Sequence, residues 1–252
     1  MIMNKISIIT VTYNCLEDFK KTFDDIRRQS YPNIEYIVID GASTDGTAEY
    51  IKEHSSLIDH WVSEPDGGIY DAMNKGIAAA TGDWALMLNA GDVLYDTDVL
   101  PNLFLGRKYD EDVLYGDYIS NRMDGPFYVK CDRPFFVRKE RFSGMGMGHQ
   151  AILVSVPVIK RFLFDTSFRC CADYNQMSAM YNAGCHFVYL GVPISVTEGR
   201  YGFSQKNRML QFREEAKICR VDGTLWYVFK YLYVVMQNVY GRIRNWMRSD
   251  KL

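Results

Sequence analysis

The sequence predicts an α/β fold in which a mostly parallel central sheet is flanked by helices. Over the first hundred residues, short apolar runs alternate with segments of helical periodicity. This alternation is typical of parallel strands joined by helices on both faces of a sheet. The chain has 252 residues, of which 48% are hydrophobic and 24% charged, an ordinary globular composition. Its length suits one substantial domain with a small appendage.

The expected elements of the first half follow from the periodicity. Residues 16–29 should form a helix, because apolar side chains recur there at spacings of three and four. The recurring residues are Leu16, Phe19, Phe23 and Ile26. Strands are expected at 6–11, 36–39, 61–62 and 84–88, and further helices at 47–54 and 68–80. Polar residues follow these strands, and in such sheets ligands sit at the carboxyl ends of the strands.

Beyond about residue 110 the pattern is looser. Strands are expected at 113–115, 127–130 and 186–190, and a helix at 173–182 that is closed by a glycine. The last part of the chain, 206–252, is expected to be a helical segment distinct from the rest.

Charge and cysteine content limit the kinds of partner and compartment. The net charge of -2 gives no basic face for a nucleic acid, which is therefore not expected as a partner. The six cysteines include no CxxC pair and no metal-ligand spacing, which indicates reduced thiols. No secretory signal precedes the first expected strand. A cytoplasmic location is therefore expected.

Two polar clusters follow the first two strands. Tyr13 lies between Thr12 and Asn14, and an aromatic ring at a strand end could stack on a nucleobase. The alternative is a turn in which the asparagine tolerates unusual backbone angles. The carboxylate of Asp40 could accept the N3–H of uracil, a donor that cytosine lacks. Asp45, further along this second cluster, has a structural interpretation as a helix cap.

Two more clusters follow later strands. Asp66 precedes paired glycines that open a helix, and Asp71 and Lys75 share one face of that helix. The lysine could offer its charge to a diphosphate, or form an ordinary surface pair worth ~0.3 kcal/mol with Asp71. Asp92 closes the run 88–92, and a carboxylate at a strand end suits Mg²⁺ or Mn²⁺. Its partners would be phosphate oxygens, water, or a distant residue such as His149.

Together these clusters resemble the large inverting family of glycosyltransferases with the GT-A fold, of the family 2 type. The resemblance is carried through residue 92 by ISIITVTYN, DGASTDGT, SEPDGGIYDAMNKG and LNAGD, in the family's order. Later landmarks are GHQA (148–151), CADYN (171–175) and PISVTEGRYGFS (193–204). The resemblance implies a GT-A catalytic domain over 1–205, with a nucleotide-sugar-binding half (1–110) and an acceptor-side half (111–205).

The resemblance also implies roles for individual residues. Asp173 would be the catalytic base, although Asp at a helix start is also a favoured cap. Asp92 would carry the Mn²⁺ or Mg²⁺, with His149 as a further metal or diphosphate contact. One departure concerns the family's Asp-x-Asp, whose two positions are Asn89 and Gly91 here. The residues expected to bind the nucleotide are Thr12, Tyr13, Asn14, Asp40, Asp66, Lys75, Asn89 and Ala90.

The implied activity is transfer of a sugar, with inversion, from a UDP-sugar or other nucleotide-diphosphate donor to an acceptor hydroxyl. The acceptor would be a glycan or lipid-linked glycan in cell-surface polysaccharide biosynthesis. A dinucleotide-dependent oxidoreductase is excluded, because 11–15 contains no glycine. A sugar nucleotidyltransferase, or a nucleotide-binding scaffold without turnover, remains an alternative.

The C-terminal segment is apolar, aromatic and basic. Residues 225–236 are apolar or aromatic apart from Lys230, and this run is shorter than the ~20 residues that span a bilayer. Such a helix could lie in the headgroup layer on the inner face of the cytoplasmic membrane, or pack against its own domain or a second subunit. Its basic residues are Lys230, Arg242, Arg244, Arg248 and Lys251.

Overall fold

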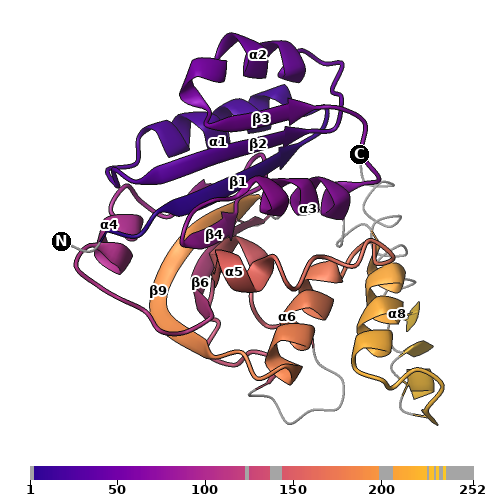
Figure 1. The fold of residues 1–252 in the computed structure, drawn as a ribbon. Coiled ribbons are helices and arrows are strands. Elements are labelled where there is room, and N and C mark those ends of the chain that lie inside the picture. The colour runs from indigo at the N-terminus through magenta and orange to yellow at the C-terminus, as the bar shows by residue number, and fades with distance from the viewer. Residues whose placement is uncertain are drawn as a thin grey trace.

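One sheet with helices on both faces organises the molecule (Figure 1). The computed structural model describes residues 3–122, 125–136, 144–198, 207–225, 227–229, 231–232 and 235–236. Within them, nine strands form the sheet in the order β3-β2-β1-β4-β8-β6-β9-β5, with β7 paired to β6. The strands are β1 (Ile6–Thr12), β2 (Ile34–Asp40), β3 (His60–Ser63), β4 (Trp84–Met87), β5 (Val93–Leu94), β6 (Val113–Arg122), β7 (Gly125–Val129), β8 (Ile152–Ser155) and β9 (Phe187–Glu198).

The helices of the first half lie where the periodicity predicts them. The α-helices are α1 (Leu16–Arg27), α2 (Thr47–Glu53), α3 (Ile69–Ala79), α4 (Val99–Phe104), α5 (Val156–Ile159), α6 (Ala172–Asn182) and α8 (Arg208–Ile218). Two 3₁₀ turns are η1 (Ser55–Leu57) and η2 (His149–Ala151). The sequence-predicted strands and helices of residues 6–88 are confirmed to within a few residues at each end.

The first half of the sheet is parallel, which gathers the polar strand ends at one edge. Strands β1, β2, β3 and β4 all run in the same direction. Their register pairs Thr12 with Asp40, and Asp40 in turn with Ser63. Because parallel strands end at a common edge, the first two polar clusters lie side by side.

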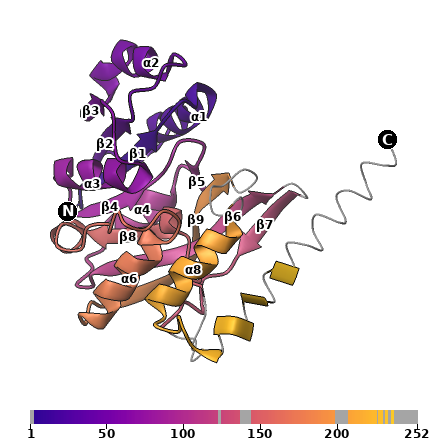
Figure 2. The same cartoon turned by 90° about the vertical axis from the view of Figure 1, so that its right-hand side faces the viewer.

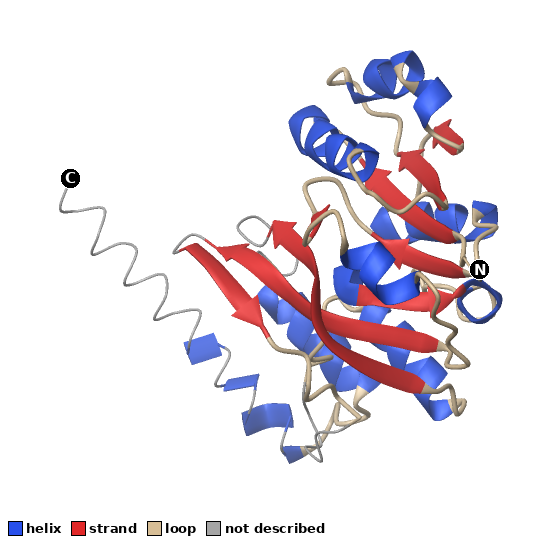
Figure 3. Cartoon of the chain, turned by 90° about the vertical axis from the view of Figure 1, so that its left-hand side faces the viewer, coloured by secondary structure: helices blue, strands red, loops and turns tan. Residues whose placement is uncertain are grey.

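The second half of the sheet is mixed rather than mostly parallel. Strand β8 runs antiparallel to both β4 and β6 and joins the two halves. Strand β6 is parallel to β9 and antiparallel to β7. Figure 3 shows the strands as one continuous twisted sheet. Strand β8 was not predicted from the sequence, because its apolar residues Ile152, Leu153 and Val154 are consecutive and carry no alternation.

Each face of the sheet has its own apolar core. On one face, Met73 and Ile77 of α3 pack with Ile9 and Ile37. On the other face, helices α1, α2 and α4 pack against side chains such as Ile8 of β1. Neighbouring residues along a strand point to opposite faces, so these buried strands have apolar residues at consecutive positions.

Helix α8 lies beside α6 (Figure 2). The helical residues of 225–236 follow it, and there the rings of Tyr227 and Tyr231 lie 5.3 and 6.1 Å from the ring of Phe212. No helix among the described residues is long and apolar enough to cross a membrane. Residues 199–204 of the last landmark lie outside the described residues, as do Lys230, Arg242, Arg244, Arg248 and Lys251.

Candidate active site

A pocket of about 700 Å³ opens at the carboxyl ends of β1 and β4. It gathers side chains from both halves of the chain, including η2, α6 and the end of β9. Eight of the sequence-predicted site residues line it: Thr12, Tyr13, Asp66, Asn89, Ala90, Asp92, His149 and Asp173. These eight residues, which are distant in the sequence, therefore meet in one pocket at this edge of the sheet.

Three side chains form a hydrogen-bonded chain along one wall. The amide nitrogen of Asn89 lies 3.0 Å from Nε2 of His149, and Nδ1 of His149 lies 3.2 Å from Oδ2 of Asp173. An Asn amide donates to Nε2, so the neutral ring carries its proton on Nδ1 and donates to the carboxylate. The other oxygen of Asp173 accepts the N–H of Tyr174. The Asp173 carboxylate is thus held in one orientation at the start of α6.

A close backbone approach places His149 in this chain. A Cβ atom added to Gly148 would lie 2.9 Å from the ring of Tyr118, too close for any other residue without a shift. Glycine therefore allows the turn η2 to pack against that ring and present His149. Because both ring nitrogens of His149 are engaged, binding a metal through this histidine would break one of the two bonds.

Asp92 lies at the floor of the pocket and is 4% exposed. Its Oδ1 accepts the backbone N–H of Glu198 at 2.9 Å, which joins the end of β9 to the loop after β4. Burial raises the pKa of Asp92, and the N–H of Glu198 opposes that shift. A cation in the pocket would favour the ionised form and lower this pKa again.

Tyr13 and Asp66 form the wall beside the end of β2. A Cβ atom on Gly41 would lie 2.8 Å from Oδ2 of Asp66 and 3.1 Å from Cδ2 of Tyr13. Only glycine lets the chain pass this closely behind both side chains. Oδ1 of Asp66 accepts the N–H of Gly68 at 2.8 Å. The ring of Tyr13 is 64% exposed, and it remains available for stacking on a flat ligand.

Asn14, Asp40 and Lys75 are not among the lining residues. Asp40 is fully buried and accepts hydrogen bonds from the backbone and hydroxyl of Ser43 and from the hydroxyl of Ser63. The side-chain oxygen of Asn14 accepts the N–H of Thr44 at 2.8 Å. These bonds hold the loop behind the pocket wall.

Lys75 of α3 forms ion pairs with acidic side chains that are outside the pocket lining. Its ammonium donates to Oε1 of Glu64 at 2.7 Å and lies 3.9 Å from Asp71. The hydrogen bond to Glu64 raises the pKa of Lys75. Contact of Asn14, Asp40 or Lys75 with a ligand stays a prediction.

Three charged lining residues were missed by the sequence analysis: Asp18, Arg169 and Glu198. Glu198 ends β9, but the strand expected in this region covered only 186–190, so no strand end marked this residue in the sequence. Asp18 looks like an ordinary acidic residue in the first turn of a helix. Arg169 precedes α6 in a segment without periodicity, and only the folded chain brings it to the pocket.

Carboxylates outnumber cationic side chains in the pocket lining. The acids are Asp18, Asp66, Asp92, Asp173 and Glu198, and the guanidinium of Arg169 is the fixed positive charge among the lining residues. Over the described residues, no group of three or more His, Cys, Asp or Glu side chains could hold a metal ion. One or two carboxylates suffice when substrate phosphates and waters complete the shell of Mg²⁺. The lining therefore fits a divalent ion that arrives with a phosphorylated ligand.

Known proteins with related sequences are glycosyltransferases. An uncharacterised glycosyltransferase of Mycobacterium tuberculosis is 34% identical over 172 residues, covering 67% of this chain and 65% of that protein. A PGL/p-HBAD biosynthesis glycosyltransferase of Mycobacterium bovis is 34% identical over 159 residues, covering 56% and 61%. The match thus spans less than two thirds of these relatives' own length.

Solved structures share the fold at low sequence identity. S. aureus TarS 1-349, in complex with UDP-GlcNAc, has a TM-score of 0.66 at 16% identity, covering 85% of this chain and 66% of that chain. A mannosyltransferase of Pyrobaculum calidifontis, in complex with GDP-Man and Mn²⁺, has a TM-score of 0.65 at 16% identity, covering 97% and 83%. The α/β fold of the GT-A type that the sequence predicted is confirmed by these similarities.

A comparison with protein-family models matches the part of the chain that forms most of the sheet around the pocket. The description "Glycosyl transferase family 2" belongs to a family model that matches residues 7–166. This range includes ten of the eleven sequence-predicted site residues and ends before Asp173. The chain belongs to glycosyl transferase family 2.

Proposed function

We propose that this protein transfers a sugar from a nucleoside-diphosphate donor to an acceptor hydroxyl, with inversion at the anomeric carbon. The observation that carries the proposal is the oriented carboxylate of Asp173, held by His149 on the wall of a pocket that also contains Asp92. Single displacement requires one general base and no carboxylate nucleophile. General-base catalysis of this kind contributes typically ~10²–10⁴-fold to the rate.

The donor nucleoside would lie against the exposed ring of Tyr13. Stacking on an aromatic ring suits any nucleobase, because every base presents a π-face. Asp66, held by Gly68 beside that ring, would accept hydrogen bonds from the ribose hydroxyls. We propose uridine as the base, in keeping with the UDP-GlcNAc bound by S. aureus TarS, and a GDP donor would be the nearest alternative.

We propose that Asp92 takes part in holding Mn²⁺ or Mg²⁺ with the donor diphosphate. The ion would supply positive charge to the phosphate oxygens as negative charge builds on the leaving diphosphate. Asp92 is one of the acidic lining residues, and Arg169 supplies a fixed cation in the same lining. The excess of lining carboxylates would otherwise repel a diphosphate.

The acceptor hydroxyl would form a hydrogen bond to Asp173 and attack the anomeric carbon on the face opposite the leaving diphosphate. Oδ2 of Asp173 receives the hydrogen bond of His149, and a carboxylate oxygen has a second acceptor position for the hydroxyl proton. As the acceptor oxygen bonds to the anomeric carbon, the bond from that carbon to the diphosphate breaks, the diphosphate leaves with the electron pair, and the hydroxyl proton moves to Asp173. The Asn89 amide holds His149 in the tautomer that stabilises the carboxylate.

A binding protein without turnover is the second candidate, and Asn89 favours it. An amide stands at this strand end where a carboxylate would bind a metal more tightly, and its Oδ1 is buried without a hydrogen-bond partner among the residues that the structure describes. The two candidates differ in one result. A nucleotide that binds with metal but never yields a transferred sugar would support the second.

Thermal stabilisation by nucleotides tests the donor and the metal. We expect UDP or a UDP-sugar to raise the melting temperature in the presence of Mn²⁺ and to have little effect after chelation. Asp92→Asn should weaken the metal-dependent part, and Asp96→Asn, an exposed neighbour, should leave it unchanged. Equal stabilisation of wild type and Asp92→Asn would contradict the metal assignment.

We also propose that the segment 225–236 lies on an anionic lipid surface, which suits a lipid-linked acceptor. Five of its described apolar side chains are exposed and recur at helical spacing, with Leu225 at 80% and Phe229 at 66%. The sequence of 226–252 has five basic residues and one acidic residue, and each Lys or Arg near an anionic surface contributes ~1 kcal/mol. The other exposed apolar residues are Val228, Leu232 and Met236.

Flotation with vesicles tests this surface. Wild type should float with vesicles of phosphatidylglycerol and phosphatidylcholine, less so at high salt. Phe229→Glu should abolish flotation, and Leu163→Glu, which changes an apolar residue that is 51% exposed elsewhere on the molecule, should not. A dimer in gel filtration that Phe229→Glu dissociates, with no vesicle binding, would instead make the segment a subunit interface.

A further inference from the structure

One carboxylate of the C-terminal helix holds the segment that enters the active site. Glu214 of α8 is 9% exposed. Its Oε1 accepts the backbone N–H of Arg169 at 2.8 Å, and its Oε2 accepts those of Cys170 and Cys171 at 2.9 Å each. Three consecutive backbone donors therefore converge on a single side chain that lies more than 40 residues away in the sequence.

These donors stand directly before the proposed catalytic base. Cys171 is the N-cap residue of α6 and makes no side-chain cap hydrogen bond. Asp173 follows two residues later, and Arg169 and Cys170 both line the pocket. A helix N-terminus leaves backbone N–H groups without partners and favours negative charge. Glu214 supplies the acceptors from another helix.

The surroundings of Glu214 keep these bonds away from water. Cys170, Cys171 and Tyr174 form an apolar cluster with residues of α8 and the turn after it, among them Leu210 and Ile218. The hydroxyl of Tyr174 lies 3.3 Å from the sulfur of Cys219. Hydrogen bonds to a charged group are strong where water is excluded. If the three hydrogen bonds to Glu214 were lost, water could not readily replace the carboxylate, and the backbone of 169–171 would no longer be held in place.

We propose that Glu214 is a positioning residue for the transfer reaction. It fixes the backbone of 169–171, and through it the guanidinium of Arg169 and the carboxylate of Asp173, at the pocket wall. The inference rests on the proposed glycosyltransferase function and adds to it that α8 is part of the catalytic apparatus. The nucleoside side of the pocket is built from β1, α3 and the loop after β4, so it does not depend on this contact.

Glu214→Gln tests the proposal, because it keeps the shape but turns an N–H₂ group toward backbone donors. We expect kcat to fall roughly 10- to 100-fold, since small misplacement of a catalytic group has effects of this size. The affinity for uridine, which would bind the side of the pocket built from β1 and α3, should stay within about twofold. Amide hydrogen exchange should accelerate in a peptide covering 168–173. Glu49→Gln removes the same charge from an exposed site on α2 and should change none of the three.

Glu214→Asp keeps the charge on a side chain shorter by one methylene. It should restore part of the kcat and of the exchange protection lost in Glu214→Gln. If Glu214→Gln does not fold, Glu214→Asp alone decides, with a reduced kcat at unchanged uridine affinity as the expected result. A folded Glu214 variant with wild-type kcat would overturn the proposal. Absence of transfer by the wild-type protein would count against the proposed function instead, and the exchange result is independent of it.

Discussion

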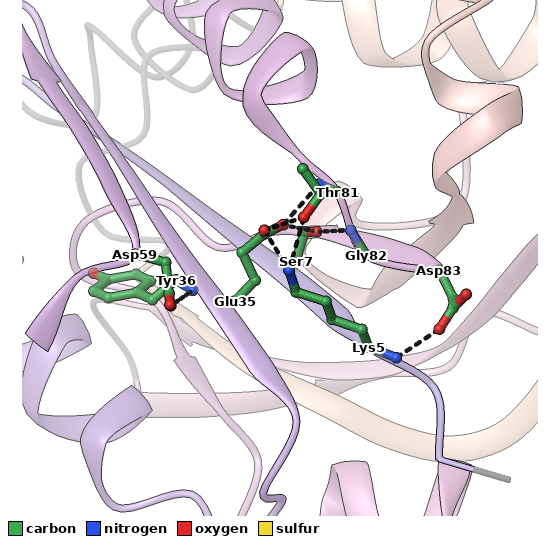
Figure 4. Close-up of polar contacts among 8 residues, drawn as sticks. All are labelled: Lys5, Ser7, Glu35, Tyr36, Asp59, Thr81, Gly82 and Asp83. Atoms are coloured by element: carbon green, nitrogen blue, oxygen red, sulfur yellow. Dashed lines mark hydrogen bonds and ion pairs between the residues drawn. The ribbon is translucent and has the colours of Figure 1, made fainter.

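The two edges of the sheet use carboxylates in opposite ways. At the amino ends of β1 and β2, Glu35 accepts hydrogen bonds from Lys5 at 2.7 Å, from Ser7 at 2.5 Å and from both the backbone and the hydroxyl of Thr81 (Figure 4). Burial alone would raise the pKa of Glu35, but these hydrogen bonds lower it to about 2. Every acceptor position there is filled by the chain itself.

At the carboxyl edge, Asp40 is saturated by the chain in the same way, but the side chains that line the pocket leave acceptors for a ligand. Asp173 receives two hydrogen bonds from the chain, and within the described part of the chain the buried Oδ1 of Asn89 has no hydrogen-bond partner. Burial raises the pKa of Asp92, the opposite of the shift at Glu35. A saturated carboxylate stabilises the fold, whereas an unsaturated one retains affinity for a ligand. The following predictions separate these two uses.

The largest effect should come from the hydrogen-bonded chain at the carboxyl edge. His149→Ala removes the donor that orients Asp173, and kcat should fall by roughly 10²-fold, with a small change in melting temperature. His60→Ala, an exposed histidine on β3, is the control. Initial rates at saturating donor measure the effect. Unchanged kcat in His149→Ala would mean that the base needs no orientation by this ring.

Glu35→Gln should act on stability and not on catalysis. It places an amide N–H₂ against Lys5 or Thr81 in a nearly buried position, at a cost on the order of 2 kcal/mol. Urea unfolding should report this loss, while kcat measured well below the melting temperature stays at the wild-type value. A loss of kcat without a loss of stability would show that the two edges are not independent.

The free energy of unfolding should depend on pH in the acidic range because of Glu35. Its folded-state pKa of about 2 is below the ordinary value of 4.5, so its contribution is complete above the unfolded-state pKa. That contribution should decline as the pH falls from about 4.5 toward 2. Urea midpoints across this window should fall more steeply for wild type than for Glu35→Gln. If the urea midpoints of the two proteins fell in parallel with pH, Glu35 would not be the source of the pH dependence.

Lys75→Met should have the smallest effect, since its ammonium is engaged by Glu64 outside the pocket. We expect the nucleotide affinity to change by less than about threefold, as for the exposed control Lys52→Met. Titration calorimetry with UDP and Mn²⁺ measures it. A tenfold loss would mean that Lys75 leaves Glu64 for the diphosphate, as the family resemblance implied.

The sequence predicted what depends on local pattern. Strand and helix alternation placed the polar clusters after β1, β2 and β4, and parallel pairing then forced them to one edge. The pattern could not predict which residues of these clusters face the pocket. Asp40 accepts hydrogen bonds from Ser43 and Ser63, and Lys75 donates one to Glu64, and these contacts are visible only in the folded chain.

The acceptor side was harder to predict for the same physical reason. The approach of Arg169 to the pocket depends on Glu214 of a distant helix. Helix α8 has no distinct apolar face, because polar residues such as Glu214 are buried there. The apolar residues of strand β8 are consecutive, so they show no alternation of apolar and polar positions. Nothing periodic in the sequence marks either feature.

The most direct test of the account is the transfer rate of Asp173→Asn beside its nucleotide affinity. The substitution keeps the shape of the side chain and removes the proton acceptor. The account predicts a loss of about 10²–10⁴-fold in kcat, with UDP binding and melting temperature as in wild type. Wild-type turnover by folded Asp173→Asn would contradict it and place the base elsewhere.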